Sequence, residues 1–163
     1  MAKLKKQHMT IHWKAIVQDD SSIPATEATL KEKATLVGRI GLMMLSVGTG
    51  AWRVRNSMNK VARCLGITCT ADIGLLAISY TCIEGTDTYT QSISNPTTGV
   101  NTHKLMQLEL FMKEFPDKVS TYSVKHIHEV LDEIQKLPAN YKAWNLGLAS
   151  AIACCAFTFL LGG

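Results

Sequence analysis

The sequence predicts an α+β protein with segregated helices and strands, followed by one C-terminal transmembrane helix. Apolar residues first repeat with helical spacing, then a stretch rich in β-branched residues and turn signals follows, and two more helical stretches come after it. Strands that follow one another without helices between them favour an antiparallel sheet. From residue 143 to residue 163 there is no Asp, Glu, Lys or Arg, which is typical of a membrane span.

Length and composition exclude several classes of protein. The chain has 163 residues, which suits one domain with an appendage and is too short for a complete multi-pass transporter. A hydrophobic share of 47% is too high for a disordered protein. The net charge of +4 is modest and no recognisable nucleic-acid-binding module is present, so we expect no nucleic acid partner. The five cysteines form an odd number, which favours a reducing compartment.

Three regions differ in composition along the chain. Residues 1–23 are polar and irregular, and we expect them to form a mobile N-terminal arm. Residues 24–140 carry the helical and strand patterns of a soluble α+β domain. Residues 141–163 begin with aromatic and cationic anchors and continue as an apolar helix, which we expect to be the first transmembrane helix.

Two helices are expected to open the soluble domain. The first is predicted over residues 26–47. Between Ala34 and Trp52 the only charge is Arg39, so this helix should be buried on most sides. Gly48 and Gly50 then break the chain, and a second helix is predicted over 51–65. All charges of the second helix are positive, and three share one face: Arg53, Lys60 and Arg63.

Two or three antiparallel strands are expected next. Residues 67–70 and 76–83 have the composition of strands, and residues 88–93 alternate polar and apolar side chains. Residues 84–87, with the sequence Glu-Gly-Thr-Asp, are typical of a turn between the last two strands. Asp72 is a lone acid in the apolar stretch that precedes this turn.

A third helix is predicted over residues 103–115. Asn101 or Thr102 is expected to cap its start, because short polar side chains accept hydrogen bonds from the first free amides of a helix. We expect Pro116 to end it, since proline disfavours the helical conformation of the residue before it.

A fourth helix is expected to start at 120–123 and to end at Leu137, before Pro138. It carries His126 and His128, but side chains two apart on a helix point about 200° apart, so we expect surface or half-buried histidines rather than a metal site. Its acidic residues are expected to form a solvated face: Glu129, Asp132 and Glu133. Its inward residues should be Val124, Ile127, Leu131 and Ile134.

No spacing in the chain marks a catalytic site. Neither a glycine-rich phosphate loop nor a nucleophile elbow is present. Cys64 and Cys69 have no second pair at zinc-binding spacing. We therefore expect no enzyme activity, no cofactor and no bound metal.

The C-terminal segment combines apolar with small residues. As a helix, residues 143–163 would be about 31 Å long, close to the thickness of the hydrocarbon layer. Four small residues are spaced so that other helices can approach closely: Gly147 with Ala151, and Ala149 with Ala153. We expect a transmembrane helix with helical neighbours in the bilayer, and the alternative is a buried core helix of a soluble oligomer. Lys136 and Lys142 precede the segment, which favours a cytoplasmic position for residues 1–142.

Three segments resemble the threonine/serine exporter family. Residues 42–67 resemble its pattern G-x-x-x-x-R-V-E-x-x-M followed by A-x-x-L-G, residues 99–105 its pattern G-[IV]-[ND]-x-x-K-L, and residues 123–163 the helix that leads into its first membrane span. The matching residues are Gly48, Arg53, Val54, Met58, Ala62, Leu65, Gly66, Gly99, Val100, Asn101, Lys104, Leu105, Leu131, Asp132, Ile134, Pro138 and Tyr141.

The resemblance implies a secondary exporter of small solutes such as threonine, serine or dicarboxylates. It implies a cytoplasmic soluble domain followed by a bundle of membrane helices, which is one long chain in some members and split between two subunits in others. This chain resembles the first part of the split type. The implied partners are a small polar solute, membrane lipid and a second short multi-span membrane subunit, and we expect a homo-oligomer.

Two features depart from the family pattern. Arg55 stands where the family often has Glu, so no role of that acid is carried over. The chain also ends after one span, and one helix cannot enclose a polar path through a bilayer. We therefore expect a fragment that does not transport solute alone.

Six residues are candidates for a binding role: Arg39, Gly48, Arg53, Asp72, Asn101 and Lys104. An alternative function is a membrane-tethered binding or regulatory module that recognises an anionic ligand or partner. It would use the positive side chains of the first two helices, Arg39, Arg53, Lys60 and Arg63. A solvated basic surface is the other account of these charges.

Overall fold

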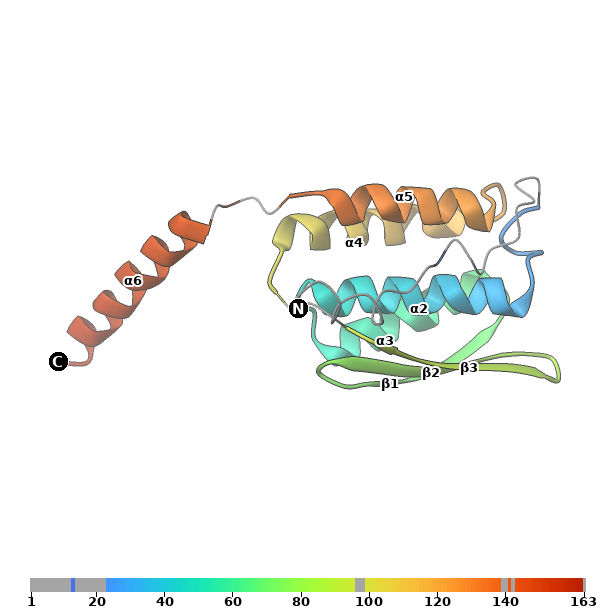
Figure 1. Ribbon diagram of the computed structural model, residues 1–163, viewed down its shortest axis with the longest axis horizontal. Helices are drawn as coiled ribbons and strands as arrows, with labels where there is room; N and C mark the ends of the chain where they lie inside the picture. The colour runs from blue at the N-terminus through green and yellow to red at the C-terminus, as the bar shows by residue number, and fades with distance from the viewer. Residues whose placement is uncertain (1–12, 14–22, 96–98, 139–140, 142, 163) are drawn as a thin grey trace, which may run out of the picture.

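The computed structural model describes residues 13, 23–95, 99–138, 141 and 143–162. The elements in these residues are α2 (Leu30–Ser46), α3 (Ala51–Cys64), β1 (Thr68–Ile73), β2 (Ala77–Glu84), β3 (Asp87–Ser94), α4 (Thr102–Lys118), α5 (Val124–Lys136) and α6 (Ala143–Leu160). All except α6 form a body of three layers: the sheet, then α2 with α3, then α4 with α5 (Figure 1). The predicted α+β class is confirmed for this part of the chain. The expected arm over 1–23 lies outside the described residues, apart from Trp13 and Ile23.

Helix α2 lies between the sheet and α5 and is buried on most sides, as predicted. It begins at Leu30, later than the expected residue 26, because Thr29 caps it. The Thr29 hydroxyl accepts a hydrogen bond from the Glu32 amide, and the Glu32 carboxylate accepts one from the Thr29 amide at 3.1 Å. This reciprocal capping satisfies amides that have no partner within the helix. The residues just before it form a turn instead.

Helix α3 packs beside α2 after a short break in the chain. Gly48 has a φ of 87°, a conformation that residues with a side chain rarely adopt, and it follows the end of α2. The predicted apolar stripe of the second helix is confirmed, because its members are all buried: Val54, Met58, Val61 and Leu65.

The three strands pair antiparallel in the order β1-β2-β3, which confirms the predicted sheet. The inner face packs on α2 and α3 and includes Tyr80, whose hydroxyl donates a hydrogen bond to Gln91 Oε1 at 2.8 Å. Tyr80 also lies against Gly38 of α2, which has no side chain to keep the sheet away. The outer face carries two pairs of hydroxyls 2.9 Å apart: Ser79 with Ser92, and Thr81 with Thr90.

Helix α4 continues past Pro116 to Lys118, so the expected end at Phe115 was wrong. Proline lacks the amide that would bond to the carbonyl of Met112, four residues earlier. In the structure, Lys60 of α3 donates a hydrogen bond to this carbonyl at 2.9 Å. A tertiary contact therefore replaces the missing helical bond, and the helix is kept.

Helix α5 begins after Ser123, whose hydroxyl accepts a hydrogen bond from the His126 amide at 3.2 Å. The inward face predicted for this helix is confirmed, since its four residues are all buried: Val124, Ile127, Leu131 and Ile134. Figure 1 shows α5 beside α4, with both helices covering the side of α2 and α3 that faces away from the sheet.

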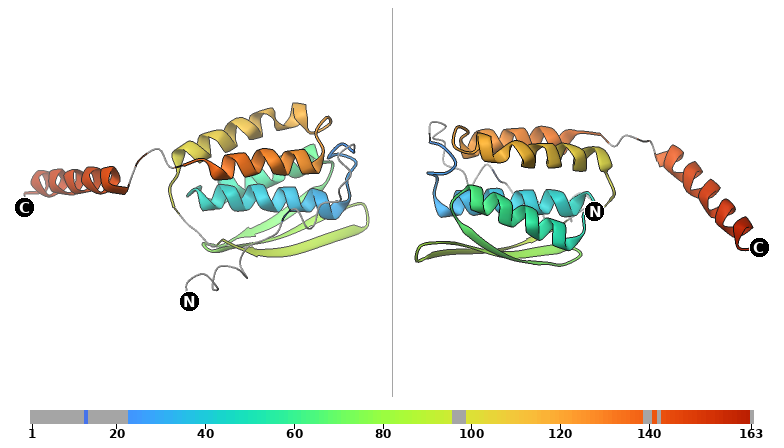
Figure 2. Two further views of the ribbon diagram at one scale, coloured as in Figure 1. Left: turned by 45° about the horizontal axis from the view of Figure 1, so that its top comes forward. Right: turned by 180° about the vertical axis from the view of Figure 1, so that it is seen from behind.

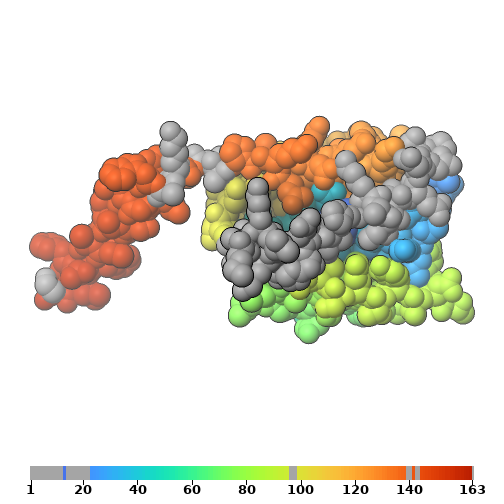
Figure 3. Space-filling view, in the orientation of Figure 1, coloured from blue at the N-terminus to red at the C-terminus, as the bar shows by residue number. Residues whose placement is uncertain are grey.

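Helix α6 stands away from the body in all views (Figures 1, 2 and 3). Its large apolar side chains are exposed, from 52% at Leu148 to 82% at Phe159, so α6 is not covered by the body of this chain. The alternative of a core helix in a soluble oligomer stays untested. The expected helix is present, but no described helix reaches the combination of length and apolar character that a membrane span requires. Its membrane-spanning role stays a prediction.

Candidate functional site

The most buried charged cluster of the body surrounds Arg39, in the middle of α2. Arg39 is 1% exposed and meets three side chains of α5. Its Nη1 lies 2.9 Å from His128 Nδ1 and donates to the His128 carbonyl at 3.0 Å. Its Nη2 forms an ion pair with Asp132 and donates to Gln135 Oε1 at 3.2 Å. One guanidinium thus ties α2 to α5 along one face of α5.

The chemistry of Arg39 also determines the state of His128. A guanidinium carries only donors, so His128 Nδ1 must be the acceptor of their contact. That nitrogen is therefore unprotonated, and a neutral imidazole carries its proton on Nε2. Burying a guanidinium is costly unless a counter-charge and further acceptors accompany it. Asp132 supplies the charge, and the backbone carbonyl of His128 and the side-chain oxygen Oε1 of Gln135 act as further acceptors.

Trp13 lies against the same cluster from the N-terminal part of the chain. Its ring centroid is 5.9 Å from Arg39 Cζ, which is within the range of a cation–π contact. It also stacks on the His128 ring, with the centroids 6.3 Å apart and the planes at 22°. The indole thus covers both side chains at once.

This cluster corrects two expectations about α5. His126 is on the surface, but His128 is 1% exposed, so the two histidines do not share one environment. Asp132 does not belong to a solvated face, because it is the ion-pair partner of Arg39. The sequence held part of this signal, because a buried arginine needs an acid, but the sequence did not indicate which acid would supply it.

Arg39 and Lys104 converge on Gln135. Arg39 binds the side chain of Gln135, whereas Lys104 Nζ donates to its carbonyl at 2.6 Å, near the end of α5. Asn101 caps α4, as expected, since its Oδ1 accepts from the Lys104 amide at 3.1 Å. Gly48 lies nearby, because the Asn101 amide bonds to the Val47 carbonyl at 3.3 Å.

Arg53 and Asp72 lie apart from this group. Arg53 is half-exposed on α3 and forms an ion pair with Glu109 of α4. Asp72 is exposed on the outer face of the sheet, opposite Ser79. The six candidate residues therefore do not form one pocket.

The basic side chains of α3 are used in contacts within the body. Besides Arg53 and Lys60, Arg55 donates to the Ala71 carbonyl at 3.0 Å and Arg63 to the Asn59 carbonyl at 3.3 Å. The contacts of Arg53, Lys60 and Arg55 join α3 to α4 and β1, whereas the contact of Arg63 stays within α3. Each contact occupies a donor that an anion would need.

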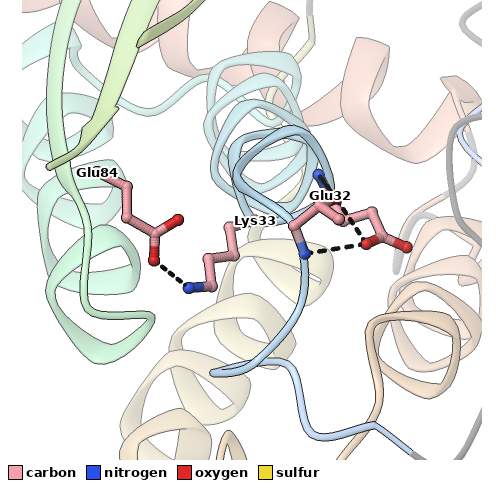
Figure 4. A network of polar contacts seen from close by, with 4 residues as sticks. Glu32, Lys33 and Glu84 are labelled. Carbon is pink, nitrogen blue, oxygen red and sulfur yellow. Dashed lines mark hydrogen bonds and ion pairs between the residues drawn. The ribbon is translucent and has the colours of Figure 1, made fainter. Parts of the chain in front are cut away.

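A second buried cation was missed from the sequence. Lys33 of α2 is 4% exposed, and its ammonium lies 2.5 Å from Glu84 Oε1 at the end of β2 (Figure 4). Its neighbour Glu32 turns the other way, to the start of α2, where it completes the cap with Thr29. These two neighbouring charges therefore contact different elements, and the charge pattern of the sequence alone does not predict this difference.

Two cysteines meet on the inner face of the sheet. Cys69 and Cys82 are direct cross-strand partners, and both are buried. The hydrogen bond from the Cys82 thiol to Cys69, together with burial, raises the pKa of Cys82. All cysteines of the described residues are free, and no group of three metal-ligating side chains occurs in that part of the chain.

Comparison with known proteins gives one match. A family model described as "Putative threonine/serine exporter" matches residues 35–163, which include most of the body and all of α6. No curated protein and no solved structure matches the chain. The match agrees with the resemblance found in the sequence, and the family is one of transporters. The chain therefore belongs to the threonine/serine exporter family.

Proposed function

We propose that this chain is the cytoplasmic domain and first membrane span of a secondary exporter of small solutes, such as threonine-like or serine-like amino acids or dicarboxylates. The family match over residues 35–163 carries the proposal, because it covers the body and α6 together. In this proposal the body assembles or regulates the exporter, and the membrane helices form the solute path.

The character of α6 supports a place in lipid. It carries no charged side chain, and its large apolar residues face outward on all sides. Gly147 has no other atom within 4 Å of the position of an added Cβ, so a neighbouring helix could approach there. Tyr141 and Trp144, both exposed, lie at the start of the segment, where aromatic residues anchor a span at the membrane interface.

Transport requires more membrane helices than α6 alone. A solute path must be shielded from lipid by several packed helices, which bind the solute near the middle of the bilayer. We propose that further spans of the same exporter and a second, short multi-span subunit supply them. The lysines before α6, Lys136 and Lys142, favour the cytoplasmic side for residues 1–142.

The alternative of an anion-binding module has less support. Arg39 is enclosed by Asp132 and the other acceptors of α5, and Arg53 is paired with Glu109. Lys60 donates to a backbone carbonyl. These contacts leave few donors of the basic face for a ligand.

Membrane fractionation and transport test the proposal. The full chain should stay in the membrane pellet after alkaline carbonate extraction, and proteolysis from the cytoplasmic side should remove residues 1–142. Vesicles that contain the whole exporter, with this chain as its first part, should export labelled threonine, serine or a dicarboxylate, whereas vesicles with this chain alone should not. A chain that stays soluble without detergent contradicts the membrane part, and absence of export of every solute contradicts the transport part.

A further inference from the structure

One end of the body exposes a group of large apolar side chains. Trp52 is 70% exposed, Leu75 is 89%, Leu76 is 63% and Val100 is 82% exposed. These four residues, here called the apolar end, come from the start of α3, the β1–β2 turn and the segment before α4. Apolar side chains this exposed and this close are unusual for a surface that faces only water.

Hydrogen bonds and one close side-chain contact hold these segments at the same end of the body. The Asn95 amide bonds to the Leu76 carbonyl at 2.7 Å, which joins the end of β3 to the β1–β2 turn. Arg55, one turn after Trp52, donates to the Ala71 carbonyl near the end of β1. An added Cβ on Gly48 would lie 3.2 Å from a methyl of Val100, so the break before α3 touches the segment before α4.

Helix α6 leaves the body from this same end. Helix α4 starts here, and Lys104 in its first turn bonds to the carbonyl of Gln135 in the last turn of α5. The chain continues from α5 to α6. Figures 1 and 2 show the β1–β2 turn, the start of α4 and the end of α5 on the side of the body nearest α6. The opposite side holds the β2–β3 turn and the α4–α5 connection.

We propose that the apolar end rests in the headgroup region of the bilayer that α6 enters. This inference depends on the proposed function, because α6 must lie in the membrane. Side chains as exposed as Leu75 and Val100 project from the body instead of lining a groove, which suits insertion between headgroups better than a fitted protein partner. Two positive side chains of the same segments suit anionic headgroups. Arg55 of α3 and Lys104 of α4 donate to backbone carbonyls and not to carboxylates, so both keep a net positive charge.

Tryptophan fluorescence in vesicles tests the contact. The full chain is reconstituted in phosphatidylcholine and phosphatidylglycerol vesicles, with or without lipids brominated just below the headgroups. A Trp13→Phe/Trp144→Phe variant reports Trp52 alone, and a Trp13→Phe/Trp52→Phe variant reports Trp144 alone. The matched control is Thr90→Trp in a chain without the three native tryptophans, since Thr90 is exposed on the outer face of the sheet.

Brominated lipid should reduce the emission of Trp52 about twofold, because it quenches indoles at the membrane interface. It should leave the emission of the Thr90→Trp control almost unchanged, and Leu75→Glu/Leu76→Glu should abolish the quenching of Trp52. If brominated lipid quenches Trp144 but not Trp52, this inference is overturned and the proposed function remains intact. If Trp144 is not quenched, both this inference and the proposed function are overturned.

Trp13 packs on Arg39, so its replacement could unfold the body, and a second measurement avoids it. The quenchable emission of Trp144→Phe is compared with that of Trp52→Phe/Trp144→Phe, and Trp13 is kept in both. Loss of the quenchable fraction on removal of Trp52 supports the lipid contact. An equal quenchable fraction in both variants overturns the lipid contact. The contact is also overturned if the Trp52 emission shifts to the blue only when the second subunit is present and is not quenched by brominated lipid.

Discussion

Gly38 and Tyr80 approach so closely that a Cβ added to Gly38 would lie 2.2 Å from the Tyr80 hydroxyl oxygen. Helix α2 can lie directly on the sheet only because this position has no side chain. Tyr80 is 1% exposed and held by Gln91, so it has little room to move. The contact fixes the distance between the first two layers of the body.

Gly38→Ala should therefore destabilise the body by about 1–3 kcal/mol, the usual range for overpacking a tight core. Denaturant unfolding of the full chain in detergent, followed by circular dichroism, measures the change. Gly99→Ala is the control, because no atom lies within 4 Å of its added Cβ. Equal stability of Gly38→Ala and the wild type would contradict the close approach.

Lys60→Met should cost about 1 kcal/mol, because the Met112 carbonyl, which Pro116 leaves without a helical partner, loses the donor that Lys60 supplies. Pro116→Ala supplies an amide for the same carbonyl. The double variant should then lose less stability than the sum of the two single changes, and a double-mutant cycle measures the difference. Strict additivity would show that the two groups do not compete for this carbonyl.

Asp132→Leu should destabilise the body by about 3–5 kcal/mol, because it leaves a buried guanidinium without its counter-charge. Arg39→Met/Asp132→Leu removes both charges and should recover much of this loss. Thermal unfolding of the single and double variants measures the effect. Lys118→Met is the control, since its pair with Glu114 is exposed and should contribute little. A double variant as unstable as Asp132→Leu would contradict the account of the cluster.

Asn101→Ala should cost about 1 kcal/mol through loss of the α4 cap. Asn101→Asp keeps an acceptor for the Lys104 amide and should remain close to the wild type. If export has been reconstituted, its rate for each variant separates the two roles of this residue. A rate that falls in Asn101→Asp at full stability would assign Asn101 to solute binding, whereas a rate that follows stability would assign it to capping alone.

The dependence of the unfolding free energy on high pH should reflect the ionisation of the buried Tyr80 hydroxyl. Burial is the main cause that raises the pKa of Tyr80 above its usual value near 10. The folded chain therefore holds this proton more tightly than the unfolded chain, so the stabilisation is complete below about pH 10 and is lost as the pH rises further. Unfolding free energies from pH 8 to pH 11 should fall more steeply for the wild type than for Tyr80→Phe. Tyr141→Phe is the control, and equal slopes for the wild type and Tyr80→Phe would contradict the prediction.

Much of the fold was predictable because local patterns and tertiary contacts agree. The apolar stripes of α3 and α5 face the core as expected, and the turn at residues 84–87 joins β2 to β3. The expected start of α2 at residue 26 was too early, because the capping pair of Thr29 and Glu32 lies further along the chain and fixes the first turn. Helix α4 continues beyond Pro116 because Lys60, which is far away in sequence, supplies the donor for the Met112 carbonyl.

The candidate site was less predictable than the fold. Arg39 was singled out because it interrupts an apolar helix, but its partners lie in a helix far along the chain. Nothing in the spacing of α5 distinguishes Asp132, which pairs with Arg39, from its exposed neighbour Glu133. Partner choice depends on how two helices cross, and a single sequence does not contain that angle.

Helix α2 touches α3, β2, β3 and α5, so every layer of the body depends on it. No layer can separate without exposing either its apolar faces or the guanidinium of Arg39 to water. The body should therefore melt as one cooperative unit, in a single transition seen alike by all spectroscopic probes. A partial chain that ends before α5 should be unable to complete that transition, and α5 should be the last piece needed before the nascent domain becomes resistant to proteases.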